Sequence, residues 1–333
     1  MNNNNNLIGS WVRRFLMEHL IADRNLTPNT QASYRDAMIL FLPFVSSQKQ
    51  KAVDQLTFKH VTEDMVRQFL GYLEKERNCS IATRNQRLAA IHAWARFIGG
   101  RCPEQIAWCT RIRSVPFKKT VTPVIDYLEK AEMDALLEMP DRTRTQGRRE
   151  YAMLLFLYNT GARADETAHA TIADLTLGSA PSVRILGKGN KVRHCPLWSH
   201  TSETLNPLVG GREPSERIFL NRRRQPFTRF GVYSLVKRSA EKANKRIPSL
   251  RKKKVGPHTI RHTTAVHLLR SGVDLNTIRA WLGHVSLDTT HIYAEIDLEM
   301  KAEALAHCKL KTKEQEKKRW KKDPNVIEFL KSL

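Results

Sequence analysis

Apolar residues recur at helical spacing through the first hundred residues of the chain. Leu7, Trp11 and Phe15 follow one another four residues apart, so they share one face of a helix. A second helix is expected to begin at Thr27-Pro28, because threonine is a good helix cap and proline fits the first helical position. The apolar positions of this second helix are Tyr34, Met38, Leu42, Phe44 and Val45.

Two further helices are expected, each with a clear start signal. Thr62 and Ser80 stand just before apolar periodic stretches, where N-cap residues are typically found. Gly99-Gly100 is a typical helix end. Residues 1–112 are therefore predicted to form a small domain of four helices.

Residues 113–123 (RSVPFKKTVTP) combine prolines, cations and β-branched residues. This composition predicts an extended linker. Lys118 and Lys119 could cross a phosphate backbone from this linker, although an ordinary solvated linker explains them equally well.

The pattern changes in the second domain, which is expected at residues 124–310. Two short alternating stretches, 183–186 and 191–197, flank Gly187-Lys188-Gly189-Asn190, which predicts an antiparallel hairpin. The other periodic stretches read as helices at 128–139, 151–158, 227–243, 258–270, 275–282 and 287–293. The fold class is therefore mainly α with a small antiparallel sheet, an α+β catalytic domain.

Residues 311–333 form a basic tail that ends in a short apolar helix pattern. Such a short helix cannot bury its apolar face alone. Docking on another subunit and folding back on its own domain both remain open.

The charge balance narrows the functional class. The chain has 56 Lys and Arg against 33 Asp and Glu, a net charge of +23. Residues 1–123 hold 18 basic and 9 acidic groups, so both domains are basic. Two basic domains suit a clamp around nucleic acid, although solvated surface charge and a basic membrane-surface protein are the simpler alternatives.

Cysteine usage and hydropathy indicate a cytoplasmic protein. The five cysteines are scattered and odd in number, which argues against a disulfide framework. No stretch reaches the ~18 apolar residues that a membrane span needs, and no signal peptide is expected. We therefore expect no contact with a membrane.

Several residues of the second domain suit the chemistry of a phosphodiester. Arg163 and Arg261 could hold its non-bridging oxygens from two sides, because a guanidinium binds two oxygens at once. Lys188 at the hairpin tip could protonate a leaving 5′ oxygen. His258 could accept a proton, since its pKa suits that task.

Three more residues complete the candidate set. Tyr293 is a candidate nucleophile if cations and a base surround its phenol. His284 could donate a hydrogen bond to a phosphoryl oxygen, and Glu166 could orient Arg163 by an ion pair three residues away. Taken singly, each of these residues has a plainer explanation in packing or in surface pairing.

Four stretches of the second domain resemble the tyrosine recombinase (phage integrase) family, in its Xer-like and mobile-element integrase branch. They are TGARADE at 160–166, GKGNKVR at 187–193, HTIRHTTAVHLLRSG at 258–272 and WLGHVSLDTTHIYAEI at 281–296. The N-terminal helices resemble the family's core-binding (SAM-like) DNA-binding domain less specifically.

The resemblance implies a site-specific DNA recombinase or integrase that works through a 3′-phosphotyrosine, without metal, ATP or another cofactor. Its implied catalytic residues are Arg163, Lys188, His258, Arg261, His284 and the nucleophile Tyr293, with Glu166 supporting Arg163. The expected DNA contacts are Lys118, Lys119, Lys191 and Arg193. The implied partners are double-stranded DNA and a homotetrameric synapse, with a second recombinase or accessory protein left open, in the cytoplasm of a bacterium and associated with its nucleoid.

Three alternatives compete with this interpretation. A type IB topoisomerase uses similar groups to relax DNA, and a non-catalytic DNA-binding accessory protein would need only the basic surface. A metal nuclease is the third, because His258 and His262 are spaced to bind zinc. Arg261 between them would repel the cation, and no third ligand stands at a supporting spacing.

Overall fold

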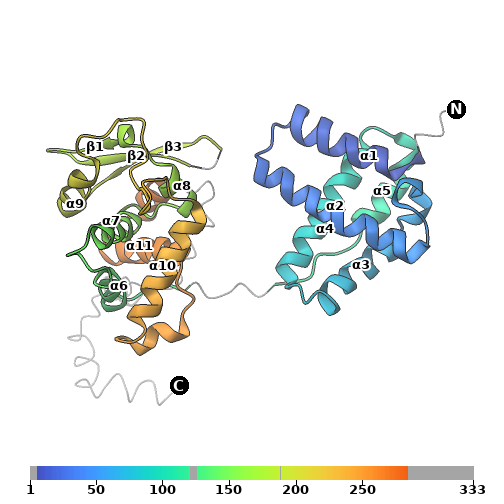
Figure 1. The fold of residues 1–333 in the computed structure, drawn as a ribbon. Helices are drawn as coiled ribbons and strands as arrows, with labels where there is room; N and C mark the ends of the chain where they lie inside the picture. The colour runs from blue at the N-terminus through green and yellow to red at the C-terminus, as the bar shows by residue number, and fades with distance from the viewer. Residues whose placement is uncertain (1–5, 121–125, 188, 284–333) are drawn as a thin grey trace, which may run out of the picture. The chain divides into compact units, whose positions relative to one another are not determined.

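The chain divides into two units, one ending at Pro123 and the other beginning at Val124 (Figure 1). This computed structural model describes residues 6–120, 126–187 and 189–283. Each unit has its own hydrophobic core.

The described part of the first unit consists of helices and their connections, with one isolated bridge between Leu7 and Thr57. Its main elements are α1 (Ile8–Arg14), the π-helix η2 (Phe15–Asp23), α2 (Pro28–Lys49), α3 (Glu63–Lys75), α4 (Ile81–Gly99) and α5 (Ile106–Arg113), with 3-10 turns at Val53–Gln55, Phe58–His60 and Pro103–Gln105.

The predicted start signals lie where the helices begin. The hydroxyl of Thr62 accepts a hydrogen bond from the amide of Met65 at 3.2 Å, and that of Ser80 accepts one from Thr83 at 3.3 Å. Pro28 occupies the first turn of α2. The two hydroxyls bind amides that have no partner within the helix. Because such caps are local in the sequence, the starts of these helices could be predicted.

A fifth helix, α5, was not predicted. It packs against α4 through buried Trp108 and Ile112. The indole of Trp108 donates to the carbonyl of Val61 at 2.6 Å. The prediction of a four-helix domain was therefore one helix short.

The stretch after α5 is fastened to the first unit rather than free. Val115 is buried, and Arg84 donates to the carbonyl of Pro116 at 3.1 Å. The side chain of Asn85 pairs with both backbone groups of Lys118, at 2.8 and 3.1 Å. The first half of the expected linker therefore belongs to this unit.

The second unit combines helices with a small sheet. Its elements are α6 (Lys130–Leu137), α7 (Thr145–Thr160), α8 (Ala164–His169), β1 (Leu175–Thr176), β2 (Ser182–Leu186), β3 (Val192–Pro196), α9 (Ser199–Val209), α10 (Arg229–Ala243), α11 (Pro257–Arg270) and α12 (Leu275–Leu282), with 3-10 turns at Ile172–Asp174 and Pro248–Lys252. The strands are antiparallel in the order β1-β2-β3. The mainly α fold class with a small antiparallel sheet is confirmed.

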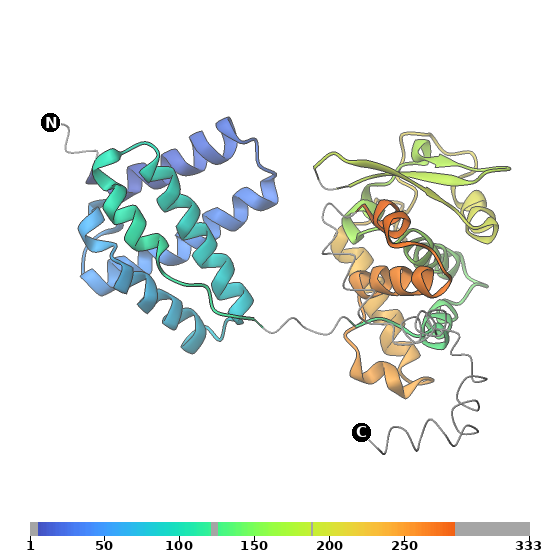
Figure 2. The same cartoon turned by 180° about the vertical axis from the view of Figure 1, so that it is seen from behind.

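Helix α7 is the centre of the second core. It is buried continuously from Ala152 to Thr160 and packs against α9 and α11. Helix α12 lies against α11 and β3 (Figure 2). This packing brings the end of α7, the start of α11 and the end of α12 close to the hairpin.

Within the described ranges, no helix combines the length and the apolar character needed to cross a membrane.

Candidate active site

The candidate site begins at the turn between α7 and α8. Gly161 ends α7 with φ +59°, a left-handed conformation that favours glycine. A Cβ at this position would lie 2.5 Å from Cδ2 of Leu282, so α12 packs directly on the turn. Two residues later, Arg163 occupies the N-cap position of α8.

Glu166 joins two arginines below this turn. Its carboxylate accepts a hydrogen bond from Nη1 of Arg163 at 2.6 Å and another from Nη2 of Arg193 at 2.7 Å. The backbone amide of Arg163 also donates to it at 2.9 Å. The ion pair expected from the spacing of Arg163 and Glu166 is therefore present, and a second one accompanies it.

This carboxylate stays ionised although it is buried. Burial alone would raise the pKa of Glu166, but the hydrogen bonds and charges of Arg193 and Arg163 outweigh it and hold the pKa at about 2. An ionised Glu166 fixes the guanidinium of Arg163, which remains about one-third exposed. Arg163 thus keeps a surface through which it can meet a ligand.

Arg261 is held from two directions by backbone carbonyls. Its Nη1 donates to Gly161 at 2.7 Å, and its Nη2 donates to Leu282 at 2.6 Å. The residue is only 3% exposed. The second arginine is therefore locked beside the turn that carries Arg163.

His258 lies on α11, one helical turn before Arg261, and it is exposed. Desolvation of the ring, and then the charges of Arg261 and Arg163, lower the pKa of His258, while Glu166 opposes them. Both arginines and Glu166 therefore act electrostatically on this imidazole. A histidine that is neutral at pH 7 can accept a proton.

His262 stacks near His258, with ring centroids 6.4 Å apart. Burial and then the charges of His258 and Arg261 lower the pKa of His262 to about 4. Among the described residues, no three His, Cys, Asp or Glu side chains converge as a metal site.

The C-terminal end of α12 is bound by the same arginines. Nε of Arg193 donates to the carbonyl of Trp281 at 2.9 Å, next to the Leu282 carbonyl that Arg261 holds. Gly283 ends the helix with φ +67°. The predicted residues His284 and Tyr293 follow this point and lie outside the described residues.

The β2–β3 hairpin lies against α12, next to the candidate site. Gly189 and Asn190 have φ +75° and +58°, which explains glycine and asparagine in this tight turn. Lys188 lies outside the described residues. Lys191 is exposed and lines a cavity of about 740 Å³ between the hairpin and α12.

The four expected DNA contacts have different surroundings. Lys191 and Lys119 are exposed, whereas Nζ of Lys118 pairs with Glu74 at 2.6 Å in the first unit. Arg193 is 9% exposed, because β3 turns it inward toward Glu166. The guanidinium of Arg193 therefore pairs with Glu166, which the sequence did not predict.

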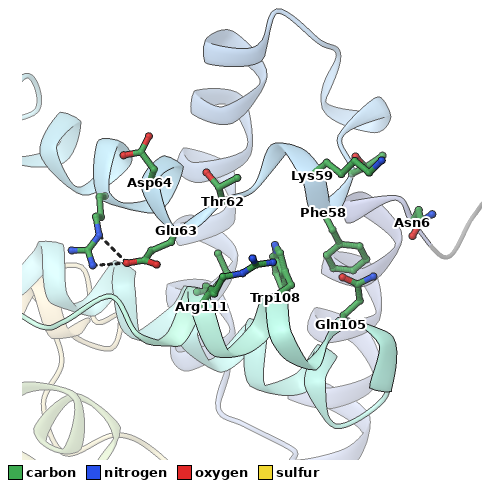
Figure 3. A pocket seen from close by; sticks show the side chains of 12 residues that line it. Asn6, Phe58, Lys59, Thr62, Glu63, Asp64, Gln105, Trp108 and Arg111 are labelled. Atoms are coloured by element: carbon green, nitrogen blue, oxygen red, sulfur yellow. Dashed lines mark hydrogen bonds and ion pairs between the residues drawn. The ribbon is translucent and has the colours of Figure 1, made fainter.

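The first unit has a cavity of its own, of about 770 Å³, beside the starts of α3 and α5 (Figure 3). Apolar Phe58 and Trp108 line it together with charged Glu63, Arg67 and Arg111. Arg67 and Glu63 already pair with each other. Because the predicted catalytic residues belong to the second unit, this cavity is not the candidate active site.

A helical unit followed by an α+β unit that contains Arg163, Glu166, His258 and Arg261 is the arrangement expected of a tyrosine recombinase. Residues 126–300 match the phage integrase family, and residues 12–99 match the phage integrase N-terminal SAM-like domain. The chain belongs to the phage integrase family. The family membership predicted from the sequence is confirmed.

Relatives and solved structures agree with this assignment. A Sinorhizobium fredii protein named as an integrase/recombinase is 34% identical over 321 residues, which is 96% of each chain. Tyrosine recombinase XerC of Roseiflexus sp. is 31% identical, covering 84% of this chain and 88% of the relative.

Among solved structures, the XerH site-specific recombinase bound to palindromic difH substrate has a TM-score of 0.65 at 23% identity, over 85% of this chain and 81% of that one. The Tn1549 transposon integrase in complex with a circular intermediate DNA has a TM-score of 0.66 at 17% identity, over 89% and 98%. These two likenesses establish the fold. The family and the named relatives confirm the predicted enzyme class, a site-specific DNA recombinase, and do not favour the topoisomerase or accessory-protein alternatives.

Proposed function

We propose that Tyr293 is the nucleophile of this recombinase and that duplex DNA is its substrate. The phenolic oxygen attacks a backbone phosphorus, the bond from phosphorus to the 5′ oxygen breaks, and a 3′-phosphotyrosine forms. The covalent link conserves the energy of the phosphodiester. A 5′-hydroxyl from a partner strand can therefore reverse the step without ATP.

The other residues move the protons and balance the charge. His258 accepts the proton of the attacking phenol, and Lys188 donates one to the leaving 5′ oxygen. Arg163 and Arg261 bind the non-bridging oxygens, whose negative charge grows in the transition state. His284 donates a further hydrogen bond to the phosphoryl group, and no metal ion is required.

The single observation that carries this proposal is the fixed pair of arginines beside His258. Glu166 orients Arg163, and two backbone carbonyls orient Arg261. Donors that are already oriented stabilise a transition state without reorganising during the reaction. Such a site suits a substrate whose charge grows on two oxygens at once.

We also propose that residues 1–112 bind DNA as the core-binding domain and that residues 124–310 carry the chemistry. Lys191, Lys118 and Lys119 add phosphate contacts. The assembled form is a tetramer on two duplexes, to which residues 311–333 add a subunit contact. The protein acts in the bacterial cytoplasm on nucleoid DNA, since its named relatives are bacterial.

A nicked suicide substrate tests the proposal. Cleavage releases a short strand that carries the 5′-hydroxyl, and its loss traps the covalent complex because nothing remains to reverse the step. The wild-type protein is expected to form an adduct that survives denaturation, both with and without EDTA. Tyr293→Phe should bind the same DNA and form no adduct. An adduct in that variant would remove Tyr293 from its role, and loss of the wild-type adduct in EDTA would favour metal chemistry.

A further inference from the structure

Arg193 differs from the other cations of the hairpin. Arg184 on the neighbouring strand is half exposed and pairs with Asp174 at 2.6 Å, and Lys191 is exposed. Arg193 is buried, with 9% of its surface accessible. Burying a guanidinium costs desolvation free energy unless hydrogen bonds and an opposite charge offset it. The partners of Arg193 therefore indicate what it does.

The guanidinium of Arg193 connects two parts of the site. Nη2 binds Glu166, the carboxylate that also holds Arg163. Nε binds the carbonyl of Trp281 in the last turn of α12. The same side chain also packs against Gly283, where a Cβ would lie 3.1 Å from its Cδ.

We propose that Arg193 is a positioning residue for strand cleavage, one that holds the arginine clamp (Arg163 and Arg261) in a fixed position relative to the end of α12. This inference rests on the proposed function, in which His284 follows Gly283 directly and Tyr293 lies ten residues beyond it. Arg193 stands on β3, in register with Ile185 of β2, so it also ties the hairpin that carries Lys188 to both groups.

The end of α12 has a particular need for such a residue. The last carbonyls of a helix have no partner within the helix, and cationic side chains favour this negative end. Arg193 takes the carbonyl of Trp281 and Arg261 takes that of Leu282. Arg193 and Arg261 therefore fix the position of the last turn of α12. Arg261 also belongs to the arginine clamp.

The test compares Arg193→Met, Arg193→Lys and the matched control Arg184→Met on the suicide substrate. DNA affinity is measured by anisotropy, the rate of adduct formation is measured at saturating DNA, and folding is checked by thermal unfolding. Arg193→Met is expected to bind DNA as the wild type does and to react on the order of 100-fold more slowly, the cost of misplacing reacting groups by about 1 Å. Arg184→Met should keep the wild-type rate.

Arg193→Lys keeps the charge but cannot bridge two acceptors with a fixed fork. We expect its rate to lie between those of the wild type and Arg193→Met, roughly tenfold below the wild type, halfway on a logarithmic scale to the 100-fold loss. If Arg193→Met does not fold, the lysine variant decides. A slow reaction with unchanged affinity supports the inference, and a wild-type rate overturns it.

A pH profile separates positioning from simple loss of stability. The charged and titratable groups that act on Glu166 or on its neighbours are Arg163 at the N-cap of α8, Arg193 and Cys195 on β3, and His258 and Arg261 on α11. Without Arg193, fewer charges oppose the effect of burial on Glu166, so its pKa rises. The carboxylate is then protonated at a higher pH and no longer holds Arg163. The rate of Arg193→Met relative to the wild type should therefore fall further as the pH is lowered from 8 to 5.

The outcomes distinguish the two proposals. A wild-type protein that forms no adduct overturns the proposed function, and this inference with it. Wild-type adduct formation together with an unchanged rate in folded Arg193→Met overturns this inference alone. A loss of DNA affinity with a normal saturated rate would instead make Arg193 a DNA contact.

Discussion

Replacing Glu166 with glutamine is expected to destabilise the second unit by about 3 kcal/mol at pH 7. The structure sets this magnitude, because Arg193 and Arg163 lower the pKa of Glu166 from an ordinary value of 4.5 to about 2. Each unit of that difference corresponds to about 1.4 kcal/mol of folding free energy. Glutamine also leaves two guanidiniums beside a neutral amide, as when one partner of a buried ion pair is removed.

The same reasoning gives the dependence on pH. The folded pKa of Glu166 lies below the unfolded one, so its stabilisation is complete well above pH 4.5 and is lost as the pH falls toward 2. The difference between wild type and Glu166→Gln should therefore shrink from about 3 kcal/mol at pH 7 to about 1 kcal/mol at pH 3. Glutamine does not titrate, so the decline comes from the wild-type carboxylate.

Urea unfolding of both proteins between pH 7 and pH 3 measures this difference. Glu241→Gln is the matched control, because its carboxylate is largely exposed and lies 3.9 Å from Lys237. Such an exposed pair should contribute less than about 1 kcal/mol. A difference between wild type and Glu166→Gln that stays constant over this pH range would refute the role of the arginines in holding Glu166 ionised.

Three further predictions concern the same site. Gly161→Ala should destabilise the protein by about 2–5 kcal/mol, measured by urea unfolding, because it combines a positive φ with a contact 2.5 Å from Leu282; an unchanged stability would contradict the packing of α12 on this turn. Arg163→Ala and Arg261→Ala should each lose about 3 kcal/mol of transition-state stabilisation in single-turnover cleavage, and a normal rate in either variant would remove that arginine from the clamp. The pKa of His258 lies below 6.5, so the cleavage rate should be flat from pH 8 to 6.5 and fall at lower pH as the base is protonated; the same acid limb in a still-active His258→Gln would assign it to another group.

Much of the fold was predictable because its signals are local. Thr62 and Ser80 cap their helices through bonds that span three residues, and such signals are visible in the sequence. Helix α9 was missed because Pro207 and several polar residues interrupt its pattern. Strand β1 has two residues and depends on its pairing with β2, so nothing local announces it.

The site was predictable to the extent that its residues stand close in the sequence. The pair of Arg163 and Glu166 follows from helical spacing, and so does the proximity of His258 and Arg261. The pairing of Arg193 could not be predicted because its partners, Glu166 and Trp281, are 27 and 88 residues away. Its burial is a product of tertiary packing, and strand alternation alone does not reveal which face is inside.

The central claim is that the clamp presents one phosphate to the phenol of Tyr293. Mass spectrometry of the protease-digested suicide complex tests this most directly, because it identifies both the modified residue and the DNA end. The account predicts one adduct, in which the oxygen of Tyr293 is joined to a 3′-phosphate. An adduct on another residue, or one on a 5′-phosphate, would contradict it.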